Sequence, residues 1–126
     1  MRQEEIVNEI RKKCGNVKIL PLIGWHFTYH GRYFVYLPRD NENMIRFCIP
    51  YLANANRSDT RVVSETINET NRNVKFIKAV KLDSGNISLD YDHKTASDES
   101  AETIVPHIID ALDFASTYLL DKLRMI

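Results

Sequence analysis

The hydrophobic positions of this chain begin with a helical period. Residues 2–14 place Ile6, Val7 and Ile10 on one helical face and leave most of the charged side chains outside it. Gly15 follows and predicts the end of the helix, because glycine adopts the left-handed conformation without strain. The pattern therefore predicts one short helix that packs through a single face.

The next stretch changes to the two-residue period of β-strands. Between residues 17 and 37 it predicts a hairpin with a tight turn at His30 and Gly31. Pro21 and Gly24 indicate a bend or an edge position before the first strand. The aromatic residues of that strand alternate with histidine and threonine and are expected on one face; they are Trp25, Phe27 and Tyr29.

A third strand is predicted over residues 44–49, with Pro50 at its end. The connections between the three strands are too short for crossovers, so an antiparallel meander is the simplest arrangement. A polar helix is predicted over residues 56–72, capped by Ser58 or Asn56 and carrying only a thin apolar stripe.

The last part of the chain contains the clearest hairpin and the longest helix. Alternating residues predict strands over 73–82 and 86–92. The helix is expected to be capped by Ser97 or Asp98 and to end near residue 123, with Pro106 kinking or unwinding its first turns. The elements fit one α+β domain over residues 1–126, in the order α-β-β-β-α-β-β-α. We expect a five-stranded, mostly antiparallel sheet with the helices on one face.

The second hairpin and its neighbours resemble known families. A polar helix ending at residues 69–73 runs into the hairpin at residues 75–91, which reads KFIKAVKLDSGNISLDY, and a long helix follows. In order and spacing, nearly the whole chain resembles the YbjN-like domains and the related fold of type III secretion chaperones. This resemblance implies no enzyme activity. It implies a bacterial binding module, chaperone-like or regulatory, that is homodimeric and holds extended segments of client proteins.

Composition limits the partners and the compartment. The 17 basic residues equal the 17 acidic ones, so nucleic acid is not expected as a partner. No stretch approaches the roughly 20 apolar residues of a membrane span, and the first residues form no apolar run of signal-peptide length. We therefore expect a cytoplasmic protein that does not contact membranes. Cys14 and Cys48 are interpreted as free thiols in a reducing compartment.

The candidate reactive groups form no recognisable motif. On one strand His26 and His30 would lie about 13 Å apart, too far for two ligands of one metal ion. We expect neither a metal nor another cofactor. Asp90 and Asp92 would share the solvent-facing side of a half-buried strand. No catalytic residue is assigned from the sequence.

Surplus apolar surface is the remaining functional signal. Eight residues of the first hairpin and the last helix form a candidate partner-binding or dimer surface: Trp25, Phe27, Tyr29, Phe34, Tyr36, Ile109, Phe114 and Tyr118. Two interpretations stay open for them, core packing with scattered exposed tyrosines and an exposed patch for an unidentified protein partner or a second copy. The favoured function is a non-catalytic protein-binding module. The alternative is a small-molecule-binding domain or weak enzyme with a pocket between the sheet and the C-terminal helix.

Overall fold

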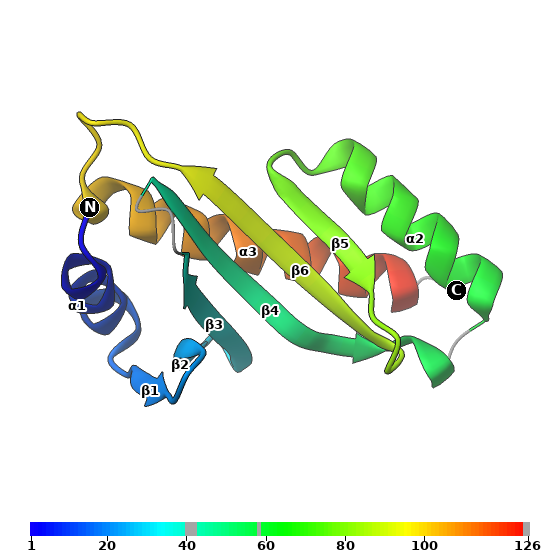
Figure 1. The fold of residues 1–126 in the computed structure, drawn as a ribbon. Helices are drawn as coiled ribbons and strands as arrows, with labels where there is room; N and C mark the ends of the chain where they lie inside the picture. Colours follow the sequence, from blue (N-terminus) through cyan, green and yellow to red (C-terminus); the bar gives the residue numbers. More distant parts are fainter. Residues whose placement is uncertain (40–42, 58, 125–126) are drawn as a thin grey trace.

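A computed structural model describes residues 1–39, 43–57 and 59–124 of the chain (Figure 1). These residues form three α-helices, a short 3-10 helix and one open antiparallel sheet of six strands, which confirms the α+β class. The elements in chain order are α1 (Gln3–Cys14), β1 (Lys18–Leu20), β2 (Gly24–Tyr29), β3 (Arg32–Pro38), β4 (Met44–Asn54), η1 (Ala55–Arg57), α2 (Thr60–Asn73), β5 (Ile77–Lys81), β6 (Asn86–Lys94) and α3 (Ala101–Arg124).

The sheet has the strand order β1-β2-β3-β4-β6-β5, and every neighbouring pair is antiparallel. In Figure 1 the long helix α3 lies behind the sheet, with α1 on one side of it and α2 on the other. Both shorter helices contact α3, while α1 also contacts β2 and α2 also contacts β5. The free edges of the sheet are therefore β1 at one end and β5 at the other.

The expected number of strands was wrong by one. The additional strand is β1, only three residues long, which pairs with the start of β2. Pro21 and Leu22 turn the chain immediately after it, and Leu22 takes a left-handed φ of +66°. The apolar run in this part of the sequence has no two-residue alternation, so its periodicity does not reveal a strand.

The third predicted strand is longer than expected, because Pro50 does not end it. Strand β4 continues to Asn54, and its pairing with β6 shifts between Ile49 and Ala53. Such a bulge leaves a residue without a ladder hydrogen bond, which is where a strand tolerates proline. The bulge therefore lets β4 pass Pro50 and reach η1.

The structure corrects both predicted helix caps. Asp59 caps α2, since its carboxylate accepts hydrogen bonds from the backbone N–H groups of Arg61 and Val62. Asn56 instead lies in η1, and Ser58 lies outside the described residues. At the start of α3 the N–H of Thr103 donates to the hydroxyl of Ser100, not to Ser97 or Asp98.

The long helix remains α-helical through Pro106, so the local unwinding expected there does not occur. Pro106 is the sixth residue of α3, and a proline near the start of a helix removes a single intrahelical hydrogen bond. The buried face of α3 continues on both sides of it, from Val105 to Leu119.

The turns at the N-terminal end follow the sequence closely. Gly15 caps α1 in the left-handed conformation, with φ +77° and its N–H bonded to the carbonyl of Arg11. His30 and Gly31 have φ values of +50° and +76°. Two consecutive positive φ values are typical of the tight hairpin turn that matches strand twist, so the predicted β2–β3 hairpin is confirmed.

The two faces of the sheet differ in chemistry. One face packs against the helices and holds the core, with Phe47 of β4 near its centre and completely buried. On the other face, Arg46 donates two hydrogen bonds to the carboxylate of Asp92, at 2.6 and 2.7 Å. This pairing lowers the pKa of Asp92. Asp90 and Asp92 lie on this second face, as expected.

Candidate functional site

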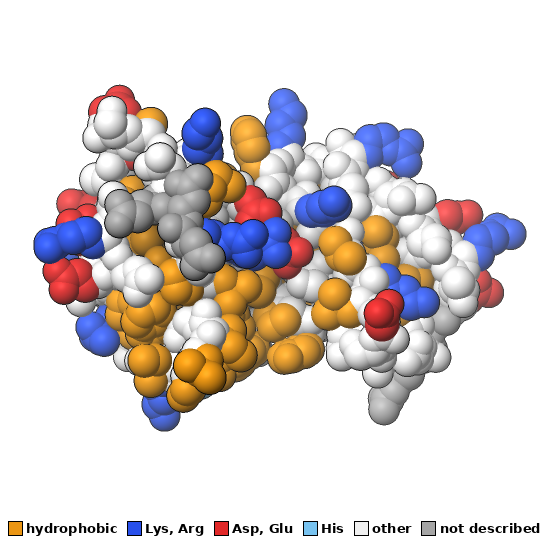
Figure 2. Space-filling model, in the orientation of Figure 1, with side chains coloured by type: hydrophobic (Ala, Val, Ile, Leu, Met, Phe, Trp, Pro, Cys, Tyr) orange, Lys and Arg blue, Asp and Glu red, His pale blue; other side chains and the backbone are white. Residues whose placement is uncertain are grey.

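Exposed apolar side chains gather at the turn between β1 and β2. Ile19, Leu22 and Ile23 are 66%, 108% and 54% exposed, and we call these three residues the β1–β2 tip. Figure 2 shows hydrophobic side chains concentrated over this end of the molecule. Leu22 is fully exposed, and its positive φ is uncommon for a residue other than glycine. Contiguous exposed apolar surface of this kind is typical of an interaction site.

A hollow of about 310 Å³ lies beside the tip, and its walls include Trp25, Pro38 and Arg39. The Trp25 ring stacks on Tyr36, with 5.7 Å between the ring centroids. Gly24 permits the close approach of β2 to β3, because a Cβ there would overlap the carbonyl oxygen of Tyr36. The single tryptophan of the chain is thus held next to the tip.

Two asparagine side chains cover backbone groups at the sheet edges. On β5, Ala79 donates its N–H to Asn71 Oδ1 at 2.6 Å, and Asn71 Nδ2 donates to the Ala79 carbonyl at 3.0 Å. On β2, Thr28 donates its N–H to Asn16 Oδ1 at 2.9 Å, and Asn16 Nδ2 donates to the Thr28 carbonyl at 3.0 Å. Each amide replaces one residue of a neighbouring strand, which protects an edge from pairing with another chain.

Strand β1 carries no such cover at its centre. The N–H and C=O groups of Thr28 point toward Asn16, on the side of β2 where β1 lies. Every second residue of a strand points its backbone groups to the same side, so those of His26 and Gly24 point toward β1. Their partners in β1 are the first and last residues of that strand. The N–H and C=O of Ile19, between them, consequently point away from the sheet. Within the described residues, Ile19 forms the middle of an exposed strand edge bordered by apolar side chains.

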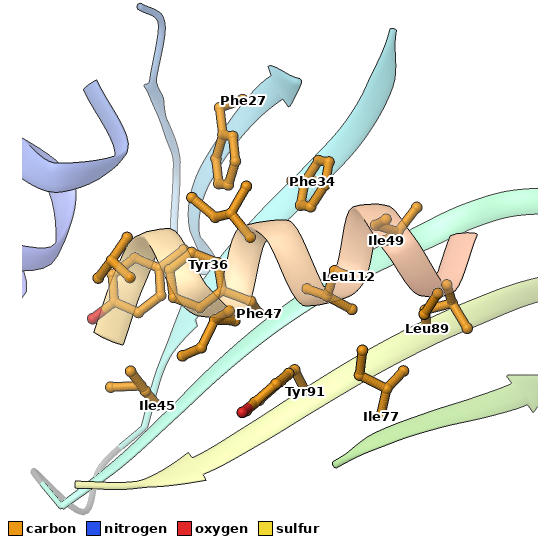
Figure 3. Close-up of a cluster of buried hydrophobic side chains, with 14 of the residues drawn as sticks. Phe27, Phe34, Tyr36, Ile45, Phe47, Ile49, Ile77, Leu89, Tyr91 and Leu112 are labelled. Atoms are coloured by element: carbon orange, nitrogen blue, oxygen red, sulfur yellow. The ribbon is translucent and has the colours of Figure 1, made fainter. Parts of the chain in front are cut away.

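Half of the predicted surface residues lie in the core instead. Phe27, Phe34, Tyr36 and Ile109 are at most 1% exposed. Figure 3 shows the first three of these packed with residues of β4 and with Leu112 of α3. The strand register pairs Phe27 with Phe34 and Trp25 with Tyr36, so all these aromatics share the face that the helices cover. Core packing, one of the two interpretations, is correct for these four residues.

The other four predicted residues lie at the boundary or on the surface. Trp25, Tyr29 and Tyr118 are half-buried, and Phe114 is 65% exposed on α3. The hydroxyl of Tyr29 donates to Asp110 Oδ1 of α3 at 3.3 Å. Only Trp25 lies beside the tip, so the structure does not bring the eight residues together into one surface.

Charged side chains fasten the β2–β3 hairpin to α3. Asp113 accepts a hydrogen bond from Arg32 and contacts His30 Nδ1, each at 2.8 Å. Arg32 also donates to the hydroxyl of Thr117 at 3.3 Å. These groups bond to one another across the two elements, so the arrangement positions the hairpin.

The two cysteines are poor nucleophiles. Burial raises the pKa of Cys48 to about 12 and that of Cys14 to about 11. Since the thiolate is the reactive form, little of either side chain is ionised near neutral pH. Neither thiol forms a disulfide.

Native protein should therefore react with a disulfide reagent about 100-fold or more slowly than protein unfolded in guanidinium, because unfolding restores an ordinary thiol pKa. Release of the coloured thiolate from Ellman's reagent measures both rates. The Cys14→Ser variant assigns the remaining signal to Cys48. A thiol that reacts equally fast before and after unfolding would contradict the buried, protonated state.

His26 and His30 have separate partners. His26 packs on Tyr33, with 5.5 Å between ring centroids, whereas His30 contacts Asp113. Among residues 1–39, 43–57 and 59–124, no group of three or more His, Cys, Asp or Glu side chains is placed to hold a metal ion.

No helix in the same ranges has the length and apolar character needed to cross a bilayer.

Comparison with known proteins adds no assignment. No protein-family model matches this sequence, and no curated protein matches it. Three structural features bear on function: the exposed edge of β1, the β1–β2 tip and the hollow beside Trp25.

Proposed function

We propose that this chain is a non-catalytic protein-binding module, chaperone-like or regulatory, that receives an extended segment of a partner protein along β1. The observation that carries the proposal is the free backbone edge at Ile19, bordered by the exposed side chains of Leu22 and Ile23. An extended peptide added to a sheet edge gains main-chain hydrogen bonds, while neighbouring hollows select its side chains.

The sheet edges differ in whether side chains cover their backbone groups, and this difference supports β1 as the binding strand. Asn71 covers β5 and Asn16 covers β2 beyond the end of β1. Edge strands that are left open and apolar are prone to pair with other chains, and proteins usually block them. An unblocked edge at β1, in a sheet with one blocked position next to β1 and another on the opposite edge, is consistent with a docking strand.

The charges around the tip indicate the chemistry of the partner segment. Lys18 and Arg39 are exposed at the border of the tip and its hollow. Complementary charge across an interface accelerates association and disfavours wrong partners. The best occupant is therefore an extended segment with alternating apolar residues and with acidic side chains near its ends. A second copy of this chain, pairing β1 with β1, is the competing occupant.

Replacing Ile19 with proline tests the role of the edge. Proline removes the N–H that points outward and leaves the ladder to β2 intact, so the fold should survive. Peptides selected from a random library on the native protein should bind Ile19→Pro about tenfold more weakly, the equivalent of one or two lost hydrogen bonds. The emission of Trp25, which lies beside the tip, reports the binding.

Ile19→Thr is the matched control, because it keeps the N–H and the β-branched shape while reducing apolar area. It should lose less affinity than the proline variant. Unchanged affinity in Ile19→Pro would exclude strand addition at β1. Sedimentation equilibrium separates the occupants: concentration-dependent dimers that disappear in Ile19→Pro would identify the second copy, and would overturn the proposal of a different partner segment.

A further inference from the structure

A second pocket, of about 240 Å³, lies where the first turn of α1 meets the end of β3 and the start of β4, and it shares Pro38 and Arg39 with the hollow beside the tip. Ile6, Met44 and Ile45 form part of its apolar wall. The alternative predicted from the sequence places a small-molecule pocket elsewhere, between the sheet and the C-terminal helix. Its size suits a fragment rather than a drug-sized ligand, since ordinary ligand pockets begin near 300 Å³.

The hydroxyl of Tyr36 is the unusual feature of this pocket. Tyr36 lines the pocket and is only 1% exposed, with its ring stacked on Phe47. Among the described residues its hydroxyl has no hydrogen-bond partner. Every side-chain nitrogen or oxygen that is completely inaccessible to solvent in those residues does have a partner. The Tyr36 hydroxyl is therefore not completely inaccessible, and it opens onto the pocket that the residue lines. A buried hydroxyl usually finds a partner, and the structure leaves that partner to be supplied from the pocket.

The other polar groups of the pocket favour negative charge. Arg2 precedes the first turn of α1 and gives it no side-chain cap, so within the described residues only Glu5 among the first three helical residues has its N–H bonded, to the carbonyl of Arg2. Uncapped N–H groups and the helix dipole attract anions. Arg2 also pairs with Glu4 and Glu5. Arg39, on the opposite wall, forms no contact ion pair within the described part of the chain, although its charge helps to lower the pKa of Asp92.

We infer that this pocket binds a small carboxylate with a short apolar body. The carboxylate lies between the Tyr36 hydroxyl, Arg39 and the first turn of α1, and the body lies against Ile6 and Met44. A guanidinium and a hydroxyl donate charge-assisted hydrogen bonds to a carboxylate, which are stronger than neutral ones. Burial raises the pKa of Tyr36 to about 12, so its hydroxyl keeps the proton that it donates. The site shares Arg39 with the hollow beside the tip, whereas Tyr36 lines this pocket and not the hollow.

Titration with hexanoate, followed by backbone amide chemical shifts, tests the inference. Saturable shifts are expected in the first turn of α1 and around Tyr36, together with a higher melting temperature, because a ligand of the folded state stabilises it. Hexanol has the same body without the charge, and inorganic phosphate has charge without the body. Both should bind at least about tenfold more weakly than hexanoate. Equal binding of either probe, or no saturable binding of hexanoate, would overturn the inference.

Two variants locate the site. Tyr36→Phe should weaken hexanoate binding about tenfold or more, as expected for a lost hydrogen bond to a charged group. It should be at least as stable as the native protein, because it removes a hydroxyl that bonds to nothing in the fold. Arg39→Gln should also weaken binding. The control is Tyr33→Phe, the same chemical change at a position that does not line the pocket. Unchanged affinity in both pocket variants would place hexanoate elsewhere and contradict the site.

Discussion

Replacing Phe47 with alanine is expected to lower the free energy of unfolding by about 3–5 kcal/mol. Phe47 is completely buried on β4. Its ring stacks on Tyr36 at 5.1 Å and meets Phe27 edge-on at 6.2 Å between centroids. Because neighbouring strands pair with β4 on both sides, the surroundings cannot collapse easily into the cavity. The loss therefore includes both the transfer of apolar surface and the unfilled volume.

Equilibrium unfolding in guanidinium, followed by Trp25 emission and by circular dichroism, measures this loss. The matched control is Phe114→Ala on α3, the same truncation at a side chain that is 65% exposed. It should change stability by no more than about 0.5 kcal/mol. Similar losses in both variants would show that Phe47 does not hold the centre of the core.

Replacing Asn71 with alanine should have the second-largest effect, a loss of about 1–3 kcal/mol. The substitution leaves the N–H and C=O of Ala79 without their partners on β5. It also exposes a second strand edge, and exposed edges pair with other chains. We therefore expect reduced stability together with new self-association at high protein concentration.

The control for this variant is Asn68→Ala, on the exposed side of the same helix. Alanine has a higher helix propensity than asparagine, so this variant should be neutral or slightly more stable. Thermal unfolding measures stability, and light scattering across a concentration series measures association. An Asn71→Ala protein that is as stable and as monodisperse as Asn68→Ala would show that the amide contributes nothing at the edge.

Much of the fold follows from local patterns in the sequence. The helix at Gln3–Cys14, the β2–β3 hairpin and the β5–β6 hairpin each combine a clear period with a turn signal. Strand β1 lacked such a signal, because three residues are too few to show alternation. The bulge at Pro50 also depends on the pairing of β4 with β6. The sequence of β4 alone does not predict it, because the pairing is a tertiary contact.

The proposed binding surface was harder to predict for the same reason. Aromatic alternation placed Phe27 and Phe34 correctly within strands, but only the register shows that both face the helices. Ile19 and Leu22 carry the exposed surface, and their apolar character suggested core as readily as surface. Asn71 is one polar residue among many in α2, and its role arises from the approach of α2 to β5.

The paired use of Asn16 and Asn71 makes the sheet sensitive to a very small chemical change. Each side chain donates to the carbonyl and accepts from the N–H of one strand residue, as a peptide group does. Deamidation would replace the donating nitrogen with an oxygen, and the resulting carboxylate would face the carbonyl of Thr28 or Ala79 with no proton to share. Slow hydrolysis of an amide, rather than a mutation, would then open an edge of the sheet as the protein ages.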